Sequence, residues 1–301
     1  MLTFPIKNLF IEGPDCSGKT TLVKEIHRST NYKWHIHDRS QVSRKIFAKM
    51  YNRDLPYIDN DYHLEVSDLN NRFLFLVPSF DIVKSRFETR GDDIHKDISD
   101  IKKVYDAFKN MQDTLSYFPN VTFLSGDSSL WDLSEMIDCL NNSEISSIDD
   151  VSRQVFQFVK NAENESYPMQ FTLYDDGTFE SATKDDIFHK PEAEYYEKIY
   201  NKLHEKINNE LDGKNEHKVR QDISSRRFVY TDDSCISFIQ LAFRNGLMDF
   251  HVVIRSSDTE NIFPYDLRFL YYLASTCYDR LNAKGYAVRL RFNLNSAHII
   301  S

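Results

Sequence analysis

One pattern constrains the fold of this chain more than any other feature, and it occupies residues 13–20. The string Gly-Pro-Asp-Cys-Ser-Gly-Lys-Thr fits G-x-x-x-x-G-K-[ST] at every fixed position. An apolar run at 9–11 precedes it, and Leu22, Val23 and Ile26 share one helical face after it. Glycines let backbone N–H groups turn toward phosphate oxygens, and a helix N-terminus adds its positive dipole end. The pattern therefore predicts a strand, a phosphate-binding loop and a helix, in this order.

Strands and helices alternate along the first half of the sequence. After the run at 9–11, short apolar runs predict strands at 34–37, 73–77 and 121–124. Apolar residues at helical spacing predict helices over 98–108 and 133–140. Alternation of this kind is typical of a parallel sheet with helices on both faces. We therefore expect an α/β fold with a phosphate-binding loop at one end of a parallel sheet that helices flank.

A change in composition marks a domain boundary near the middle of the chain. Residues 141–150 are rich in Asn, Ser, Asp and Glu. We place the boundary there, which predicts a first domain with the phosphate-binding loop over 1–145 and a second domain over 146–301.

The second domain has the pattern of an α+β fold. Asn245-Gly246 separates apolar runs at 237–243 and 249–254, and this dipeptide is a strong signal for a two-residue hairpin turn. The other elements that we expect are helices at 151–159, 195–207 and 266–282 and a strand at 287–292.

Charge and cysteine content exclude several classes of function. The 37 basic and 46 acidic residues give a formal charge of −9, which does not favour direct binding to nucleic acid. The four cysteines form no CxxC pair, which argues against a zinc ribbon or a disulfide scaffold. No signal peptide precedes the first strand, and no apolar run approaches the roughly 20 residues of a membrane helix. We therefore expect a cytoplasmic protein without membrane contact.

Residues 12–21, Glu-Gly-Pro-Asp-Cys-Ser-Gly-Lys-Thr-Thr, resemble the start of thymidylate kinases and related deoxynucleotide kinases. The resemblance implies ATP and Mg²⁺ as cofactors. Lys19 would contact the β- and γ-phosphates as a catalytic residue, and the Thr20 hydroxyl would contact the metal. In this family the acidic residue inside the loop faces the nucleotide substrate, and Asp15 has that place. The expected ATP-binding residues are Gly13, Cys16, Ser17, Gly18, Lys19, Thr20 and Thr21.

Two further segments match the kinase resemblance. Asp38-Arg39-Ser40 is similar to the family's motif at a strand end, where the arginine holds the acceptor phosphate. In this sequence the motif comes unusually soon after the first predicted helix. Arg86 and Arg90, with Asp92, would belong to a lid whose guanidinium groups stabilise the transferring phosphoryl group. The alternatives are a surface ion pair for Asp38 and Arg39, and a solvated helix cap for the lid segment.

A second resemblance covers about residues 225–300. Cys235, Gln240, Arg255-Ser256-Ser257-Asp258 and Pro264-Tyr265-Asp266 follow the order of the thymidylate synthase core. The resemblance implies that the Cys235 thiolate adds to C6 of a pyrimidine and that Arg255 and Ser256 hold the nucleotide phosphate. Arg226 and Arg227 would contact the phosphate of a partner subunit, which requires a homodimer. Gln240, Asp258 and His298 complete the expected nucleotide site.

Departures from the synthase pattern bear on its chemistry. Asp266 replaces an asparagine, and because an ionised carboxylate only accepts hydrogen bonds, it suits the amine of cytosine better than O4 of uracil. The deoxycytidylate hydroxymethylases resemble this sequence at that position. Ile236 and Ile300 replace a histidine and a tyrosine, and no upstream catalytic glutamate motif occurs in 150–220. The segment that closes over folate does not appear before Ser301, which argues against folate as a cofactor and against catalysis by the second domain.

Three hypotheses follow from these patterns. The first is a nucleoside monophosphate kinase, acting on a deoxypyrimidine nucleotide, whose second domain binds nucleotide or builds a dimer. The second is a bifunctional enzyme that also modifies C5 of dCMP or dUMP, a pairing that suits a viral genome with a modified base and would act in a host cytoplasm. The third is a non-catalytic nucleotide-binding scaffold. Intact Lys19 and Thr20 favour the first hypothesis over the third.

Overall fold

The computed structural model divides the chain into two compact units. The N-terminal unit is Ile6–Glu144, and the C-terminal unit is Met1–Pro5 together with Ile145–Ser301. The structure describes all residues except 92–94, 96, 125–131, 167, 181–183, 185–191, 213–227 and 301.

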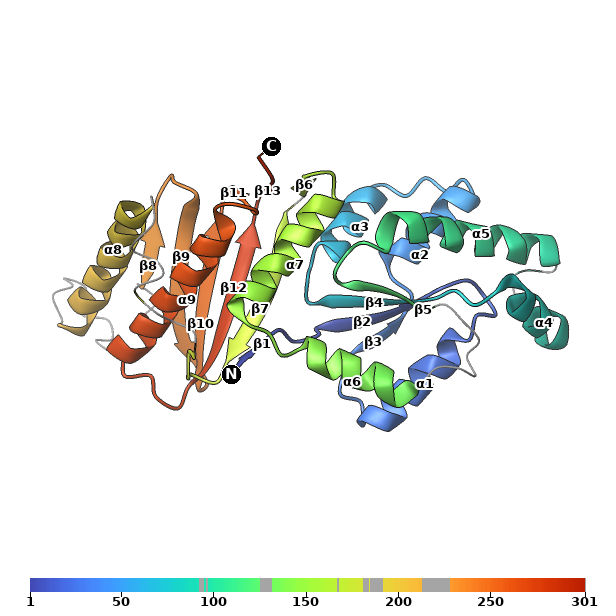
Figure 1. Cartoon of the computed structure of the whole chain (residues 1–301), viewed down its shortest axis with the longest axis horizontal. Helices are drawn as coiled ribbons and strands as arrows, with labels where there is room; N and C mark the ends of the chain where they lie inside the picture. Colours follow the sequence, from blue (N-terminus) through green and yellow to red (C-terminus); the bar gives the residue numbers. More distant parts are fainter. Residues whose placement is uncertain are drawn as a thin grey trace. The chain divides into compact units, whose positions relative to one another are not determined.

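In the part of the chain that the structure describes, the N-terminal unit contains a four-stranded parallel sheet (Figure 1). Its strands, in spatial order, are β3 (Ile36–Asp38), β2 (Asn8–Glu12), β4 (Asn71–Leu76) and β5 (Val121–Leu124). The buried pattern of β4 is continuous, as expected for a parallel strand that is covered on both faces. The predicted parallel sheet is therefore confirmed.

Helices cover both faces of this sheet. Figure 1 shows α1 (Lys19–Thr30) and α6 (Leu133–Ser143) on one face, with α2 (Gln41–Met50), α3 (Ile58–Val66) and α5 (Ile98–Leu115) on the other. Leu9, Ile11, Leu74 and Leu76 alternate along β2 and β4 and pack with Leu22, Ile26 and Leu140 in one core cluster. A further helix, α4 (Phe80–Arg90), packs through Val83 against Ile101 of α5.

The sequence predictions for this unit were incomplete at two places. Helices α2 and α3 were not predicted, although Val42 and Ile46 are buried on one face of α2. Helix α4 was not predicted either, since Arg86 and Arg90 were expected in a lid segment ahead of a helix. The strand predicted at 34–37 forms only from Ile36, while Trp34 is buried outside the strand. Residues of α2 line part of the site described below.

The described strands of the C-terminal unit form a mixed six-stranded sheet. Only the β10–β12 pair is parallel within it. The spatial order is β1 (Leu2–Thr3), β7 (Met169–Asp175), β12 (Ala287–Leu294), β10 (Leu247–Ile254), β9 (Ile236–Arg244) and β8 (Val229–Thr231). A small sheet contains β11 (Ser257–Asp258), β13 (Ala297–His298) and β6 (Glu165–Ser166).

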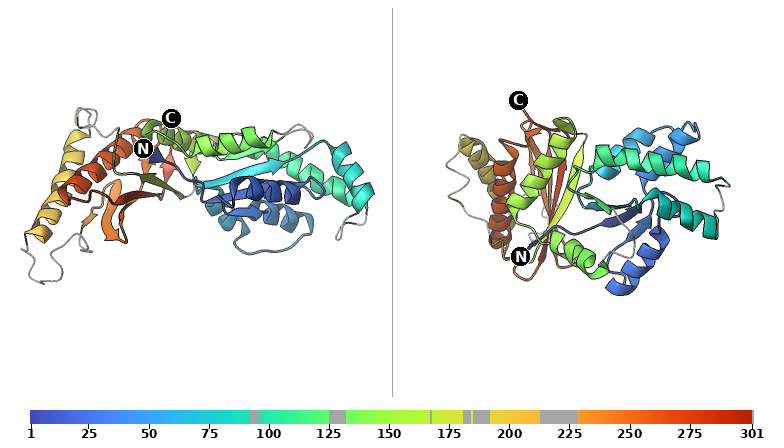
Figure 2. Two further views of the ribbon diagram at one scale, coloured as in Figure 1. Left: turned by 90° about the horizontal axis from the view of Figure 1, so that it is seen from below. Right: turned by 45° about the vertical axis from the view of Figure 1, so that its right-hand side comes forward.

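Local signals explain the main elements of this unit. Asn245 and Gly246 have φ of 50° and 74°, as the predicted hairpin turn between β9 and β10 requires. Helix α9 (Phe263–Arg280) is the crossover between the parallel strands β10 and β12. Figures 1 and 2 show α9 on the same face of the sheet as α7 (Ile148–Asn161) and α8 (Ala193–Leu211). No described helix is long and apolar enough to cross a membrane.

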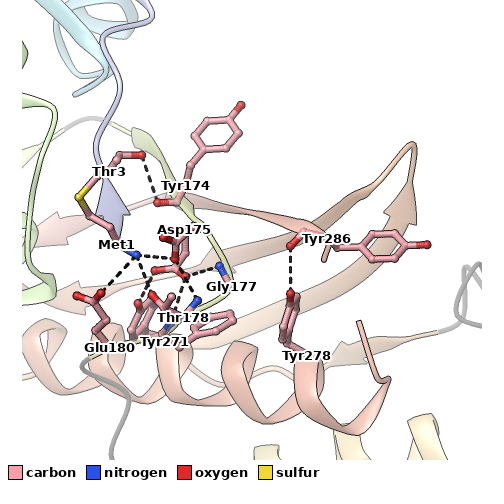
Figure 3. Close-up of polar contacts among 12 residues, drawn as sticks. Met1, Thr3, Tyr174, Asp175, Gly177, Thr178, Glu180, Tyr271, Tyr278 and Tyr286 are labelled. Carbon is pink, nitrogen blue, oxygen red and sulfur yellow. Dashed lines mark hydrogen bonds and ion pairs between the residues drawn. The ribbon is translucent and has the colours of Figure 1, made fainter. Parts of the chain in front are cut away.

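The first residues of the chain belong to the C-terminal unit rather than to the first predicted domain. Strand β1 pairs antiparallel with β7, which the sequence analysis did not predict. The α-amino group of Met1 donates to Asp176 at 2.5 Å and to Thr178 at 2.7 Å (Figure 3). Beside it, buried Asp175 accepts a hydrogen bond from the Tyr271 hydroxyl at 2.7 Å. Strand pairing and these polar contacts hold the segment at the edge of the sheet.

Candidate functional site

The loop at residues 13–18 connects β2 to α1, and two of its positions admit only glycine. A Cβ atom at Gly13, where φ is +143°, would lie 2.2 Å from the Leu76 carbonyl oxygen. A Cβ atom at Gly18, where φ is +104°, would lie 3.1 Å from a guanidinium nitrogen of Arg86. The loop is therefore packed directly against the end of β4 on one side and against α4 on the other.

Lys19 lies at the first position of α1, and its ammonium group contacts the loop backbone. Its Nζ donates to the carbonyl oxygens of Gly13 and Pro14, each at 2.8 Å. Burial lowers the pKa of Lys19, and the nearby Asp15 carboxylate opposes this effect. Ser17 is fully buried, and its hydroxyl has no hydrogen-bond partner among the described residues.

A small cavity of about 120 Å³ lies at the loop. It brings together residues from β3, α1, α4 and the loop itself that are widely spaced in the sequence. The lining residues are Asp15, Cys16, Gly18, Lys19, Thr20, Thr21, Asp38, Arg39 and Arg90. Most residues of the predicted kinase site therefore meet at one place.

The two predicted lid arginines lie on α4 and contact the loop. Arg86 donates to the Ser17 carbonyl oxygen at 2.6 Å, and Arg90 donates to the Cys16 sulfur at 3.5 Å. Both side chains line a second cavity of about 460 Å³, together with Leu22, Leu76 and Leu133. Asp92 lies outside the described residues.

A third cavity, of about 850 Å³, lies on the α2 side of the loop. Arg39 has a left-handed φ of 96°, donates to Asp15 at 2.5 Å, and lies 4.8 Å from the ring centroid of Phe47. Tyr51 stacks on Phe47 with an interplanar angle of 8°, and these rings help to line the cavity. Phe47 and Tyr51 were not among the predicted site residues, because α2 was not predicted. A helical spacing of Phe47 and Tyr51 was the signal available.

These three cavities of the described N-terminal residues share their walls. Asp15 and Arg39 line both the small cavity and the 850 Å³ cavity. Cys16, Gly18, Thr21 and Arg90 line both the small cavity and the 460 Å³ cavity. The small cavity therefore lies between two larger ones, each wide enough for a small organic molecule.

The C-terminal candidate residues also come together, through short strands. The Arg255 backbone N–H donates to the Cys235 carbonyl oxygen at 2.7 Å, and both residues are exposed. Pairing of β11 with β13 brings Ser256 within 3.5 Å of His298 Nδ1. Gln240 lies mid-strand on β9, in register with His251. Arg226 and Arg227 lie outside the described residues.

The two predicted carboxylates of the C-terminal unit, Asp258 and Asp266, accept hydrogen bonds from neighbouring side chains of the same unit. Asp266 is only 2% exposed and accepts hydrogen bonds from the Tyr196 hydroxyl at 2.8 Å and Ser257 at 3.2 Å. Burial raises the pKa of Asp266 to about 6. Asp258 is buried as well and accepts from the Asn261 side chain at 3.0 Å. A ligand could contact Asp266 only after these neighbours move.

The described residues contain no cluster of three or more His, Cys, Asp or Glu side chains that could hold a metal ion. At the small cavity, side-chain oxygens come from the Thr20 and Thr21 hydroxyls and the Asp15 and Asp38 carboxylates. One or two carboxylates of this kind suit a Mg²⁺ ion that arrives with a phosphate ligand rather than a resident metal.

Comparisons with known proteins give little more. No protein family model and no curated protein matches the chain. Solved structures that match include the crystal structure of thymidylate synthase from T4 phage, a weak similarity at 18% sequence identity with a TM-score of 0.25. The match covers 32% of this chain and 34% of that one, so this chain spans about a third of the length of the synthase. At this score the similarity carries no argument about fold or activity.

Proposed function

We propose that the N-terminal unit is a kinase that transfers a phosphoryl group from ATP to a nucleoside monophosphate. One observation carries the proposal: a small cavity at a glycine-rich loop lies between two larger cavities and shares lining residues with each. A kinase that transfers a phosphoryl group between two bound nucleotides needs this order, with the reacting phosphates in the middle and a nucleoside on either side.

The donor side would be the 460 Å³ cavity together with the loop. Leu22, Leu76 and Leu133 supply apolar surface there for a base. Lys19, at the N-terminus of α1, would exchange its contacts with loop carbonyl oxygens for contacts with the phosphates. Bound Mg²⁺ would neutralise phosphate charge, and Thr20 is the residue that would contact it. Arg86 and Arg90 hold positive charge against the loop, where it would stabilise the transferring group.

The acceptor side would be the 850 Å³ cavity. Phe47 and Tyr51 present aromatic surface for a base. Arg39 lies at the wall shared with the small cavity and would bind the acceptor phosphate, and Asp15 would face the nucleotide. The resemblance of residues 12–21 to thymidylate kinases favours a deoxypyrimidine monophosphate.

For the C-terminal unit we propose pyrimidine nucleotide binding or dimerisation. Exposed Cys235 beside Arg255 is the observation that keeps the bifunctional alternative, with C5 modification of dCMP or dUMP and use of folate. The enclosure of Asp266 by Tyr196 is an obstacle to that alternative. Light scattering of the purified protein tests the homodimer directly.

An acceptor panel tests the kinase. Purified protein is incubated with Mg²⁺-ATP and dTMP, dUMP, dCMP, hydroxymethyl-dCMP, dGMP or dAMP, and ADP release is followed. We expect release with one or a few pyrimidine monophosphates, which would also name the base. No release above background with any acceptor would contradict the proposal and favour the scaffold hypothesis.

A further inference from the structure

A carboxylate is completely buried at the junction of β2 and the glycine-rich loop. Glu12 is the last residue of β2 and is 0% exposed. It accepts hydrogen bonds from the Ser40 backbone N–H at 2.6 Å, from the Ser40 hydroxyl at 2.5 Å and from the Ser43 hydroxyl. Burial raises the pKa of Glu12, and the bonds from Ser40 and Ser43 oppose that effect. A buried carboxylate is tolerated only with such partners, so this group has a specific structural task.

Glu12 stabilises the start of α2 by accepting hydrogen bonds there. The first N–H groups of a helix have no partner within the helix and require acceptors from elsewhere. Here Ser40 N–H donates to Glu12, Gln41 N–H donates to Glu65 at 2.7 Å, and Val42 N–H donates to the Ser40 hydroxyl at 3.0 Å. Negative charge at this end is also favoured by the helix dipole. Two carboxylates from other elements therefore fix where α2 begins.

The start of α2 carries one wall of the 850 Å³ cavity. Ser40, Ser43 and Phe47 line it, and Arg39 precedes the helix with a left-handed φ of 96°. A non-glycine residue in this conformation persists only where its surroundings hold it. The Arg39 N–H bonds to the Ile11 carbonyl oxygen at 3.2 Å, and the next residue is bound by Glu12. Both restraints come from the end of β2.

We propose that Glu12 is a positioning residue that holds Arg39 and the α2 wall in register with the glycine-rich loop, so that the acceptor phosphate meets the donor. The assignment rests on the proposed kinase function for its catalytic meaning. Glu12 lines none of the three cavities and would not touch either nucleotide. Glu12 acts through α2, because its hydrogen-bond partners Ser40 and Ser43 line the 850 Å³ cavity, whereas Glu12 does not.

The kinetic test compares Glu12→Gln with wild type, using the acceptor found by the panel. A glutamine keeps the size of the side chain, but it accepts through one oxygen only and cannot satisfy all three donors. We expect the KM for the acceptor to rise about tenfold and the KM for ATP to change less than about twofold. Asp68→Asn is the matched control, because Asp68 is 4% exposed in the same unit and bonds to Lys7 and Asn70 away from the cavities. Equal changes in both KM values, or the same changes in the control, would overturn the proposal.

A second readout does not depend on activity. Amide hydrogen exchange of the ligand-free protein is measured for peptides covering 39–44 and 13–20. Glu12→Gln should accelerate exchange at 39–44 with little change at 13–20, while Asp68→Asn should change neither. If wild type has no kinase activity, the proposed function fails, and this exchange pattern alone supports or overturns the positioning role. Unchanged exchange at 39–44 overturns it.

A milder variant tests the proposal if Glu12→Gln does not fold. Ser43→Ala removes one of the three hydrogen bonds to Glu12 and leaves the carboxylate in place. The same selective rise in acceptor KM and in exchange at 39–44 is expected, with smaller size. A folded Ser43→Ala protein that behaves as wild type in both readouts would overturn the proposal.

Discussion

Glu12 in the N-terminal unit and Asp266 in the C-terminal unit are both buried carboxylates, at 0% and 2% exposure, but they have different settings. Glu12 binds the first residues of a helix whose side chains line a cavity. Asp266 binds Tyr196 and Ser257, which are themselves buried. The first carboxylate therefore supports a site that ligands can enter, whereas the second is enclosed by its own unit.

Arginines of the two units also have different settings. Arg39 and Arg90, which the sequence predicted as site residues, line the small cavity at the loop, where their charge would reach a phosphate. In the C-terminal unit, Arg289 and Arg291, which were not predicted as site residues, both bind Asp249 on the sheet, each through two hydrogen bonds.

Replacement of Lys19 should have the largest effect on activity. Lys19→Ala removes the cation that lies against the loop carbonyl oxygens. We expect kcat for phosphoryl transfer to fall by about a hundredfold or more, with the melting temperature little changed. Lys24→Ala, at an exposed position of the same helix, is the control. An active Lys19→Ala protein would remove the kinase assignment.

Replacement of Gly13 should have the largest effect on stability. The added Cβ of Gly13→Ala would lie 2.2 Å from the Leu76 carbonyl oxygen, so the loop or β4 must move. We expect a loss of about 3 kcal/mol or more in the free energy of unfolding, measured by denaturant titration. Gly246→Ala is the comparison in the other unit, because its φ is +74° but no atom lies within 4 Å. Its cost should be about 1 kcal/mol. Equal costs would show that the close packing is not needed.

Asp266→Asn should change how stability depends on pH. Because the pKa of Asp266 is raised to about 6, the fold favours the protonated carboxyl. The protonated Asp266 carboxyl therefore contributes about 2–3 kcal/mol to the free energy of unfolding. This contribution is fully present below the ordinary pKa near 4 and is lost as pH rises through 6. Asparagine cannot ionise, so the stability difference between variant and wild type should shift in favour of the variant between pH 4 and 7. A difference that is constant over this range would contradict the enclosure of an ionisable Asp266.

Cys235→Ser should have the smallest effect on phosphoryl transfer. Cys235 belongs to the C-terminal unit and lines none of the cavities at the loop. We expect kcat to stay within about twofold of wild type. Any C5 transfer to dCMP or dUMP should disappear, since the thiolate would be its nucleophile. A large loss of kinase activity would show that the two units are coupled.

Sequence patterns predicted elements well where the signal was strong and local. The strand expected at 121–124 is β5, and the turn at Asn245-Gly246 joins β9 and β10. Strand β7 was not predicted, although Met169, Phe171 and Leu173 alternate with more exposed residues along it. The helix expected over 195–207 is α8, in which Tyr196 is buried more completely than Tyr195. A helical stripe fixes a face, but neighbouring helices decide which of two adjacent aromatic residues lies innermost.

The sequence by itself determined the strand, loop and helix around residues 13–20, because backbone sterics, N–H donors and the helix dipole act over a few residues. It did not determine the partners of the buried carboxylates. Glu12 bonds to Ser43 across 31 residues, and Asp266 bonds to Tyr196 across 70. Such contacts depend on how helices pack on a sheet, which no local pattern specifies. Only the tertiary structure therefore decided that one carboxylate supports an open cavity and the other is closed off within a core.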